Sequence, residues 1–194
     1  MVYIIRYTYI NNNIMADYHF LKPFILSWEQ GYACLKGDRG GHTNKGVTLA
    51  TFRVYFGKNK TVEDLKNITD EQWDTIFLHG FWNKWQADQI GDQSIANLLV
   101  DWVYNSGKWG IIYPQRVLGV KDDGIVGPKT IAAVNDCNDK EELFGKLWKS
   151  RENYYRRIAR GEQARFLNGW MNRLSSIRYG CLVLNNRKKD RIYF

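Results

Sequence analysis

The stretch that decides the fold is WEQGYACLKGDRGGHTNKGVT, residues 28–48. It joins the end of an apolar segment to a turn rich in glycine and threonine, with Glu29 in the first part and Asp38 in the second. Upstream, apolar residues recur at intervals of three and four from Asp17 to Glu29, which is typical of an amphipathic helix. We therefore predict a helix that closes near Glu29 and is followed by a short β-hairpin or loop over residues 37–46.

The rest of the chain is predicted to be helical. Capping residues and apolar residues at helical spacing indicate helices that begin at or near Thr48, Thr61, Thr69, Asp92, Pro128, Asp139 and Phe166. No long linker, repeat or low-complexity segment separates the halves, so a division near Gly107 is a soft boundary between lobes. The predicted fold class is mainly α, with a small β-hairpin or loop after the first helix and an all-helical C-terminal lobe.

The composition indicates a globular protein. With 194 residues, 44% hydrophobic and 15% aromatic, the chain is long enough for one ordinary core or two small lobes. No stretch approaches the roughly 18 to 20 apolar residues that cross a bilayer, so no membrane span is predicted. Arg6 interrupts the apolar N-terminus and no small-residue cleavage site follows, which argues against a secretory signal. Residues 1–15 are treated as an extension without assigned function.

Cysteine usage points to neither disulfides nor a metal site. Cys34, Cys137 and Cys181 are odd in number and widely spaced, and none belongs to a CxxC pair. We predict buried, reduced thiols and no metal or cofactor. Catalysis by the Cys34 thiol is disfavoured because no histidine lies at a sequence spacing that would indicate a base paired with this thiol.

Positive charge is concentrated at the C-terminal end. The chain carries a formal charge of +8, and from Lys149 onward there are twelve Lys and Arg residues against three Asp and Glu residues. This suggests an anionic partner, either nucleic acid or an anionic polymer of a bacterial envelope, and a solvated face of helices is the alternative. No helix-turn-helix or stacking motif supports nucleic acid, so a nucleic-acid partner is not predicted.

The two acids of the opening stretch have the environments that glycosidic bond cleavage needs. Glu29 would occupy the last turn of its helix, where unsatisfied carbonyls disfavour an ionised carboxylate, and Trp28 and Tyr32 would add desolvation. Both effects should raise its pKa, as a general acid requires. Asp38, in a polar turn, should stay ionised. Glycosidases divide acid and base roles between two such carboxyl groups, although a surface glutamate and a turn aspartate would give the same pattern.

Further residues are candidates for binding a sugar. Thr43 and Thr48 offer hydroxyls, and Tyr104, Asn105 and Trp109 follow the middle helix, where they would line a cleft by hydrogen bonding and stacking. Tyr32 belongs to the same group of candidates. Trp102, on the apolar stripe of the helix, is predicted to pack in the core instead.

These residues also carry a resemblance. Glu-Gln-Gly-Tyr at 29–32 and the stretch from Asp38 to Thr48 resemble the E-G-G-Y…D-x-G-G-x-T-x-x-G-[IV]-T signature of the glycoside hydrolase 108 family of bacterial and phage muramidases and secretion activator proteins. The segments that resemble that family or the peptidoglycan-binding region that normally follows it are 87–90, 96–102, 105–107, 123–130 and 166–173. The resemblance spans roughly residues 16–180.

The resemblance implies a lysozyme-like fold and cleavage of the β-1,4 bond between N-acetylmuramic acid and N-acetylglucosamine. Glu29 matches the catalytic glutamate, and Asp38 would orient water or stabilise positive charge on the sugar. Gln30 departs from the family's glycine, and Arg39 stands where proline is common. The implied organisation is a lysozyme-like region at 16–107, a peptidoglycan-binding-like helical region at 108–180 and a basic tail at 181–194.

Two alternatives stay open. A lytic transglycosylase also needs one protonated glutamate but lets the sugar's own hydroxyl attack, and a non-catalytic envelope-binding or secretion-assisting protein would have lost the reaction. The implied partner in each case is the glycan strand of peptidoglycan, with other anionic envelope polymers as possible ligands. We expect a monomer that is made in the bacterial cytoplasm without a signal peptide and acts in the periplasm or cell wall after release or export.

Overall fold

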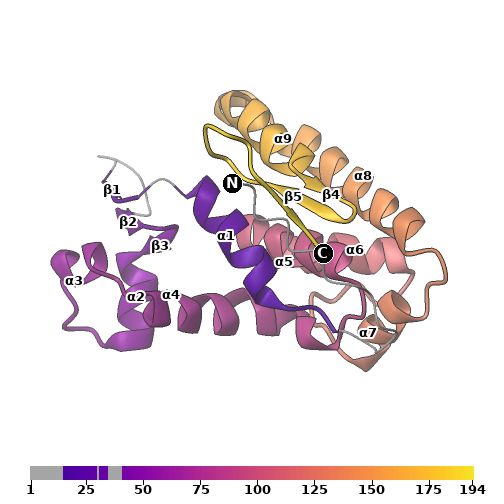
Figure 1. Cartoon of the computed structure of the whole chain (residues 1–194), viewed down its shortest axis with the longest axis horizontal. Coiled ribbons are helices and arrows are strands. Elements are labelled where there is room, and N and C mark those ends of the chain that lie inside the picture. Colours follow the sequence, from indigo (N-terminus) through magenta and orange to yellow (C-terminus); the bar gives the residue numbers. More distant parts are fainter. Residues whose placement is uncertain (1–14, 30, 35–40) are drawn as a thin grey trace.

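The computed structural model describes residues 15–29, 31–34 and 41–194, and most of them are helical (Figure 1). The α-helices are α1 (Tyr18–Trp28), α2 (Leu49–Phe56), α3 (Val62–Lys66), α4 (Asp70–Phe77), α5 (Gln93–Ser106), α6 (Trp109–Leu118), α7 (Pro128–Asn135), α8 (Lys140–Ile158) and α9 (Leu167–Ser175). A π-helical turn, η1 (Leu78–Trp82), and the 3-10 turns η2 (Asn83–Trp85), η3 (Ala87–Gln89) and η4 (Gly161–Phe166) complete the helical segments. The predicted mainly α fold class is confirmed.

Two small antiparallel sheets accompany the helices. The first, with strand order β1-β2-β3, is built from β1 (Ala33–Cys34), β2 (His42–Asn44) and β3 (Val47–Thr48). The hairpin or loop predicted over residues 37–46 is thus part of a three-stranded sheet, and residues 37–40 lie outside the described residues. The second, with order β4-β5-β6, is built from β4 (Ile177–Arg178), β5 (Cys181–Val183) and β6 (Arg191–Tyr193).

The predicted caps begin their helices. Thr61 and Thr69 each form a capping box, in which the threonine side chain accepts from the third helical backbone N–H and that residue's side chain accepts from the threonine N–H. Thr48 Oγ1 accepts from the N–H of Thr51 at 3.1 Å and so starts α2. Asp139 caps α8 in the same way. Short-range hydrogen bonding therefore fixes where these helices start.

No individual helix is predicted where α6 lies, although the region 108–180 as a whole is predicted to be helical. Pro114 lies inside it, and an internal proline removes one helical hydrogen bond, which normally argues against a helix. The helix forms because it packs closely on α5: a Cβ at Gly110 would collide with the backbone of Trp102 and Val103. Tertiary packing at this glycine outweighs the local propensity.

The C-terminal end also differs from prediction. Residues 181–194, treated as a basic tail, contain β5 and β6, and Leu182 is fully buried. The backbone N–H of Asn185 donates to Ser27 Oγ at 3.0 Å, which ties this segment to the end of α1. The apolar run 181–184 is too short for its periodicity to predict a strand.

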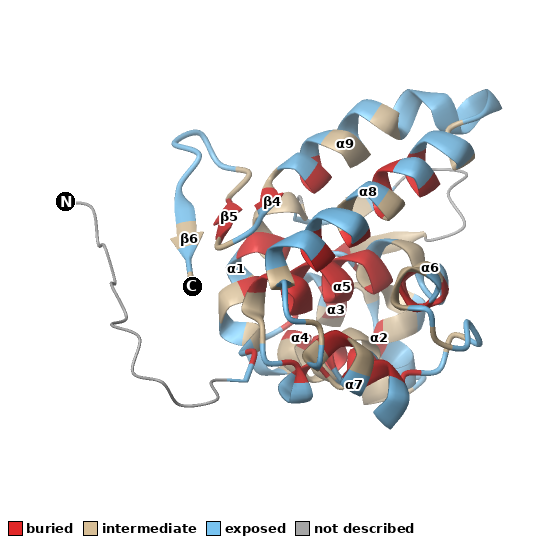
Figure 2. Ribbon diagram, turned by 90° about the vertical axis from the view of Figure 1, so that its right-hand side faces the viewer, coloured by how far each residue is buried: buried red, intermediate tan, exposed pale blue. Residues whose placement is uncertain are grey.

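Helix α5 forms the centre of the molecule (Figure 2). All ten residues at positions 94–103 are buried, including Trp102, whose predicted place in the core is confirmed. A helix that is buried on every side normally carries apolar residues only, yet Asn97 and Asp101 lie in this stretch with no exposed surface. Buried charges need partners, and Asp101 leads to the site described below.

Two further predictions concern thiols and membranes. All three cysteines are free, but only Cys181 is buried: Cys34 is exposed on β1 and Cys137 is half-buried, so the prediction that every thiol is buried is wrong for Cys34 and holds only in part for Cys137. In the described part of the chain, no helix combines the length and apolarity that crossing a bilayer requires.

Candidate active site

Glu29 lies where α1 ends. It is the C-cap residue, with extended backbone angles (φ −89°, ψ 107°), and its N–H donates to the carbonyl of Ile25 at 3.2 Å. The helix therefore ends at Trp28, close to the predicted end, and Glu29 caps it instead of lying in its last turn. About one fifth of the Glu29 side chain is exposed (21%), so the side chain reaches the surface while most of it is enclosed.

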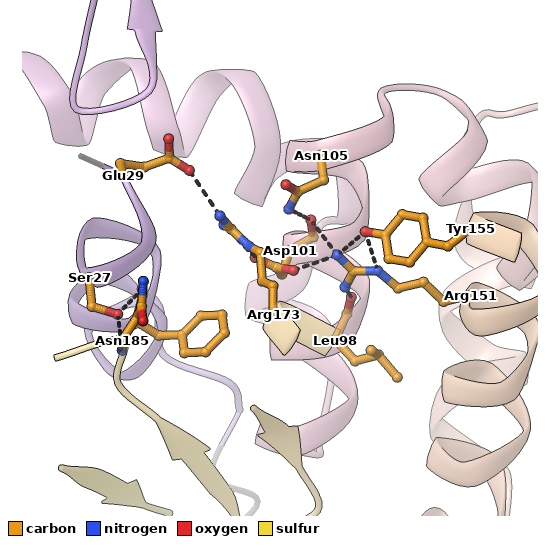
Figure 3. A network of polar contacts seen from close by, with 10 residues as sticks. Ser27, Glu29, Leu98, Asp101, Asn105, Arg151, Tyr155, Arg173 and Asn185 are labelled. Carbon is orange, nitrogen blue, oxygen red and sulfur yellow. Dashed lines mark hydrogen bonds and ion pairs between the residues drawn. The ribbon is translucent and has the colours of Figure 1, made fainter. Parts of the chain in front are cut away.

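The enclosing partner is an arginine from the far end of the chain. Arg173 on α9 donates from Nη1 to Glu29 Oε1 at 3.0 Å across a sequence separation of 144 residues (Figure 3). The expectation that Tyr32 helps to desolvate Glu29 needs correction, whereas the same expectation for Trp28 stays a prediction. Tyr32 is exposed and its hydroxyl bonds to His42 Nδ1 at 2.6 Å, while the Trp28 ring lies 6.0 Å from the Arg173 guanidinium.

Behind Arg173 lies a chain of buried charges. Arg173 donates from Nε and Nη2 to Asp101 Oδ1 at 3.0 and 2.8 Å, and Arg151 on α8 donates from Nη2 to Asp101 Oδ2 at 2.6 Å. Arg151 also donates to the hydroxyl of Tyr155 at 3.0 and 2.7 Å. Figure 3 shows this order, from Glu29 through Arg173 and Asp101 to Arg151. Helices α1, α9, α5 and α8 thus meet in one network.

The charges in the network stabilise one another. Burial alone would raise the pKa of Asp101, but the guanidiniums of Arg173 and Arg151 outweigh it and hold this pKa below its usual value. For Arg173 the balance is similar: burial acts to lower the pKa of the guanidinium, but the negative charges of Asp101 and Glu29 outweigh burial and raise this pKa. Both side chains are therefore charged at neutral pH.

The hairpin turn closes the other side of Glu29. Gly46, between β2 and β3, has φ +76°, and a Cβ placed on it would lie 2.9 Å from both Cδ and Oε2 of Glu29 and would overlap the hydroxyl of Tyr104. Glycine is thus required by the backbone angle and by the available space. The Glu29 carboxyl, the turn and the Tyr104 hydroxyl meet at this point.

Tyr104 is the predicted sugar-binding candidate that the structure brings to Glu29. Its hydroxyl is buried and forms no hydrogen bond with the described residues. Burial raises the pKa of this phenol, and the negative charge of Glu29 acts in the same direction. The group is therefore a neutral hydroxyl beside the carboxyl group.

The other candidates are engaged elsewhere. Thr48 caps α2, and Thr43 Oγ1 donates to the carbonyl of Ala33 at 3.4 Å within the sheet. Asn105 Nδ2 donates back to the carbonyl of Asp101 at 2.7 Å. Trp109 is exposed and its ring lies 6.0 Å from that of Tyr113, away from the Glu29 cluster. Contact of these residues with a sugar stays a prediction.

Some predicted features fall outside the description. Asp38, Gln30 and Arg39 lie outside the described residues, so the role proposed for Asp38 stays a prediction. Among the residues that are described, no group of three or more His, Cys, Asp or Glu side chains is arranged to hold a metal ion.

Sequence reasoning missed Arg173, Asp101 and Arg151 as members of the site. A usable signal was present, since Asp101 stands inside the apolar stretch ANLLVDW of a predicted helix. A charge in such a place requires a partner of opposite sign, but nothing in the sequence identifies which of the many arginines supplies it.

A shallow hollow of about 820 Å³ lies apart from Glu29, between α6 and α8. Its lining includes Tyr113, Tyr154 and Arg157, and the Arg157 guanidinium lies 4.8 Å from the centre of the Tyr113 ring. No residue of the Glu29 cluster lines this hollow.

A first prediction follows from the hairpin turn. Gly46→Ala should lower the free energy of unfolding by about 1–3 kcal/mol, because the new methyl group meets the left-handed backbone angle and the Glu29 carboxyl together. Urea denaturation measures the change. Gly145→Ala on α8, where a Cβ would meet nothing within 4 Å, is the matched control and should not destabilise the protein. Equal stability of the Gly46 variant and the parent would contradict the close approach.

Comparisons with known proteins agree with this architecture. The sequence profile of the family described as Glycosyl hydrolase 108 matches residues 22–107, and that described as Predicted Peptidoglycan domain matches residues 109–175. The chain is similar to the solved structure of Brucella abortus SagA, with 30% sequence identity and a TM-score of 0.71 over 82% of this chain and 91% of that chain. A search of curated proteins gave no match. Glu29 and the hairpin lie in the first matched region and Arg173 in the second, and the chain belongs to the glycosyl hydrolase 108 family.

Proposed function

We propose that the protein is a peptidoglycan hydrolase of the N-acetylmuramidase type, which cleaves the β-1,4 bond between N-acetylmuramic acid and N-acetylglucosamine. One observation carries the proposal: the Glu29 side chain is partly exposed at the end of α1, and its carboxyl group is held by Arg173 on one oxygen and lies against the Gly46 turn near the other. Membership of a glycoside hydrolase family and the match to a predicted peptidoglycan domain support the class of reaction and of substrate.

The reaction assigns a proton transfer to Glu29. Because Arg173 donates to Oε1, the oxygen that carries the proton is Oε2. This proton passes to the glycosidic oxygen as the bond between that oxygen and the anomeric carbon breaks, which leaves positive charge on the sugar. A water molecule then adds to the anomeric carbon, and the proton that it releases restores the acid form of Glu29. Asp38 is the proposed residue for orienting this water.

The second candidate is a lytic transglycosylase, and one observation favours considering it. The other carboxylate of the described cluster, Asp101, is fully buried and paired with two arginines, so it is unavailable to activate water. Without a second carboxylate to orient water, attack of the sugar's own hydroxyl on the anomeric carbon competes with attack of water. The fate of this carbon therefore depends on Asp38.

Mass spectrometry of purified peptidoglycan after digestion by the parent protein tests the proposal. Hydrolysis at the proposed bond yields fragments that end in reducing N-acetylmuramic acid, which is the expected result. Fragments ending in anhydro-sugars would assign the transglycosylase reaction instead. Intact glycan together with retention of the protein on the wall would overturn the enzyme proposal in favour of an envelope-binding protein.

The proposed partner is the glycan strand, and the basic C-terminal quarter is proposed to favour the anionic envelope. Arg151 and Arg173 do not contribute to such a surface, because they are buried against Asp101. The basic excess counted from the sequence thus overstates the positive charge on the surface. We further propose a monomer that acts in the periplasm or cell wall after release or export.

A further inference from the structure

We propose that Arg173 is a positioning residue for Glu29, so that the region matched by the predicted peptidoglycan domain completes the active site and does not serve only to bind the wall. The inference rests on the proposed function of Glu29. Arg173 lies in the matched segment 109–175, whereas Glu29 lies in the segment 22–107. The contact between them joins the two regions at the proposed reacting group.

The geometry leaves the Arg173 guanidinium little freedom. One nitrogen, Nη1, donates to Glu29, while Nε and Nη2 donate to the same oxygen of Asp101. The rings of Phe24, Trp28 and Tyr104 lie 5.9, 6.0 and 5.6 Å from the guanidinium carbon. The side chain is about nine-tenths buried (10% exposed). A planar guanidinium that donates hydrogen bonds from both of its edges fixes the position of the Glu29 carboxyl group.

The end of α1 is held by the C-terminal region at a second point. The N–H of Asn185, just after β5, donates to Ser27 Oγ, two residues before Glu29 (Figure 3). Two side chains at the end of α1, those of Ser27 and Glu29, are therefore both held by segments that follow residue 107. Small displacements of a reacting group are costly, since an error of about 1 Å can reduce a rate by about 100-fold.

The charge balance explains what Arg173 does during the reaction. Two carboxylates and two guanidiniums, those of Glu29, Asp101, Arg173 and Arg151, make the cluster neutral when Glu29 is ionised. When Glu29 gives its proton to the leaving oxygen, negative charge develops on its carboxyl group beside Arg173. An interaction that strengthens as the transition state forms accelerates the step.

Two readouts separate positioning from a structural role. In Arg173→Gln, we expect kcat to fall by about 10- to 100-fold with little change in KM, and the alkaline limb of the pH–rate profile to move to higher pH because Glu29 loses a neighbouring positive charge. Among the described residues, the charged and titratable members of this cluster that stay in place are Asp101 and Tyr104 on α5 and Arg151 on α8. The ¹³C signal of the Glu29 carboxyl, followed by NMR through a pH titration, should report a midpoint at higher pH.

Arg173→Lys and Arg156→Gln complete the set. Lysine keeps the positive charge, but its single ammonium group cannot bond to Glu29 and Asp101 from two fixed edges as the planar guanidinium does. In Arg173→Lys, kcat should therefore fall, while the NMR midpoint of Glu29 moves less than in Arg173→Gln. Arg156 lies on α8 and is more than half exposed, paired with Glu152, so Arg156→Gln should keep the parent's kcat and midpoint.

The outcomes are distinct. A folded Arg173→Gln variant that keeps both the parent's kcat and the parent's NMR midpoint overturns the proposal. If Arg173→Gln does not fold, an Arg173→Lys variant with the parent's kcat overturns it instead. If the parent itself cleaves no peptidoglycan, the proposed function fails. A midpoint that still rises in Arg173→Gln would then support, independently of activity, the control of Glu29 by Arg173.

Discussion

Replacing Glu29 with glutamine should lower the rate of peptidoglycan cleavage by about 1,000-fold, the range in which loss of a general acid falls. Glutamine has nearly the same shape, and its amide oxygen still accepts from Arg173 Nη1, so the fold and the ion network should persist. The amide has no acidic proton to give to the leaving glycosidic oxygen. The bond between that oxygen and the anomeric carbon then breaks without protonation.

The measurement is the initial rate of release of soluble fragments from purified peptidoglycan by the parent and the variant. Glu63→Gln serves as a matched control, since Glu63 is an exposed glutamate on α3 paired only with neighbours on its own turn, and it should retain the parental rate. Equal rates for Glu29→Gln and the parent would remove Glu29 from the mechanism. Unchanged unfolding midpoints would show that the loss is chemical.

Removing the carboxylate of Asp101 should lower the free energy of unfolding by about 3–5 kcal/mol, because two buried guanidiniums lose the charge between them. Arg151 would keep only Tyr155 and backbone carbonyls as acceptors, and Arg173 would keep only Glu29. Urea denaturation of Asp101→Ala measures this change. The matched control is Asp122→Ala, which removes an exposed aspartate paired with Arg116 and should leave the midpoint nearly unchanged. A similar small effect in both variants would contradict the network.

The same residue predicts how stability depends on pH. The pKa of Asp101 in the folded protein is lowered, so its contribution to stability is present above the unfolded value of about 3.9 and is lost as pH falls through the folded value. The parent should therefore lose stability in acid more steeply than Asp101→Asn, which has no proton to bind at this position. Denaturation midpoints measured from pH 7 down to pH 2 test this, and parallel curves would refute it.

The sequence by itself determined much of the local structure and pointed to Glu29 as the proposed reacting group. The capping boxes at Thr61 and Thr69 and the stripe that ends at Glu29 act between residues three or four positions apart, so local reading predicts them. The glycine in the hairpin turn is also a local feature, because a left-handed backbone angle is a property of one residue. The family signature lies within these local features, which is why Glu29 was identified from the sequence.

Only the tertiary structure decided what surrounds Glu29. The pairing of Arg173 with Glu29 and Asp101 depends on how α9 and α5 pack, and a sequence with 28 Lys and Arg residues gives no means of selecting one of them. Helix α6 and strand β5 were missed for a related reason, since the contact of Gly110 with α5 and the burial of Leu182 outweigh weak local signals. Packing brings distant charges together and sets their burial, and burial determines how strongly such charges interact.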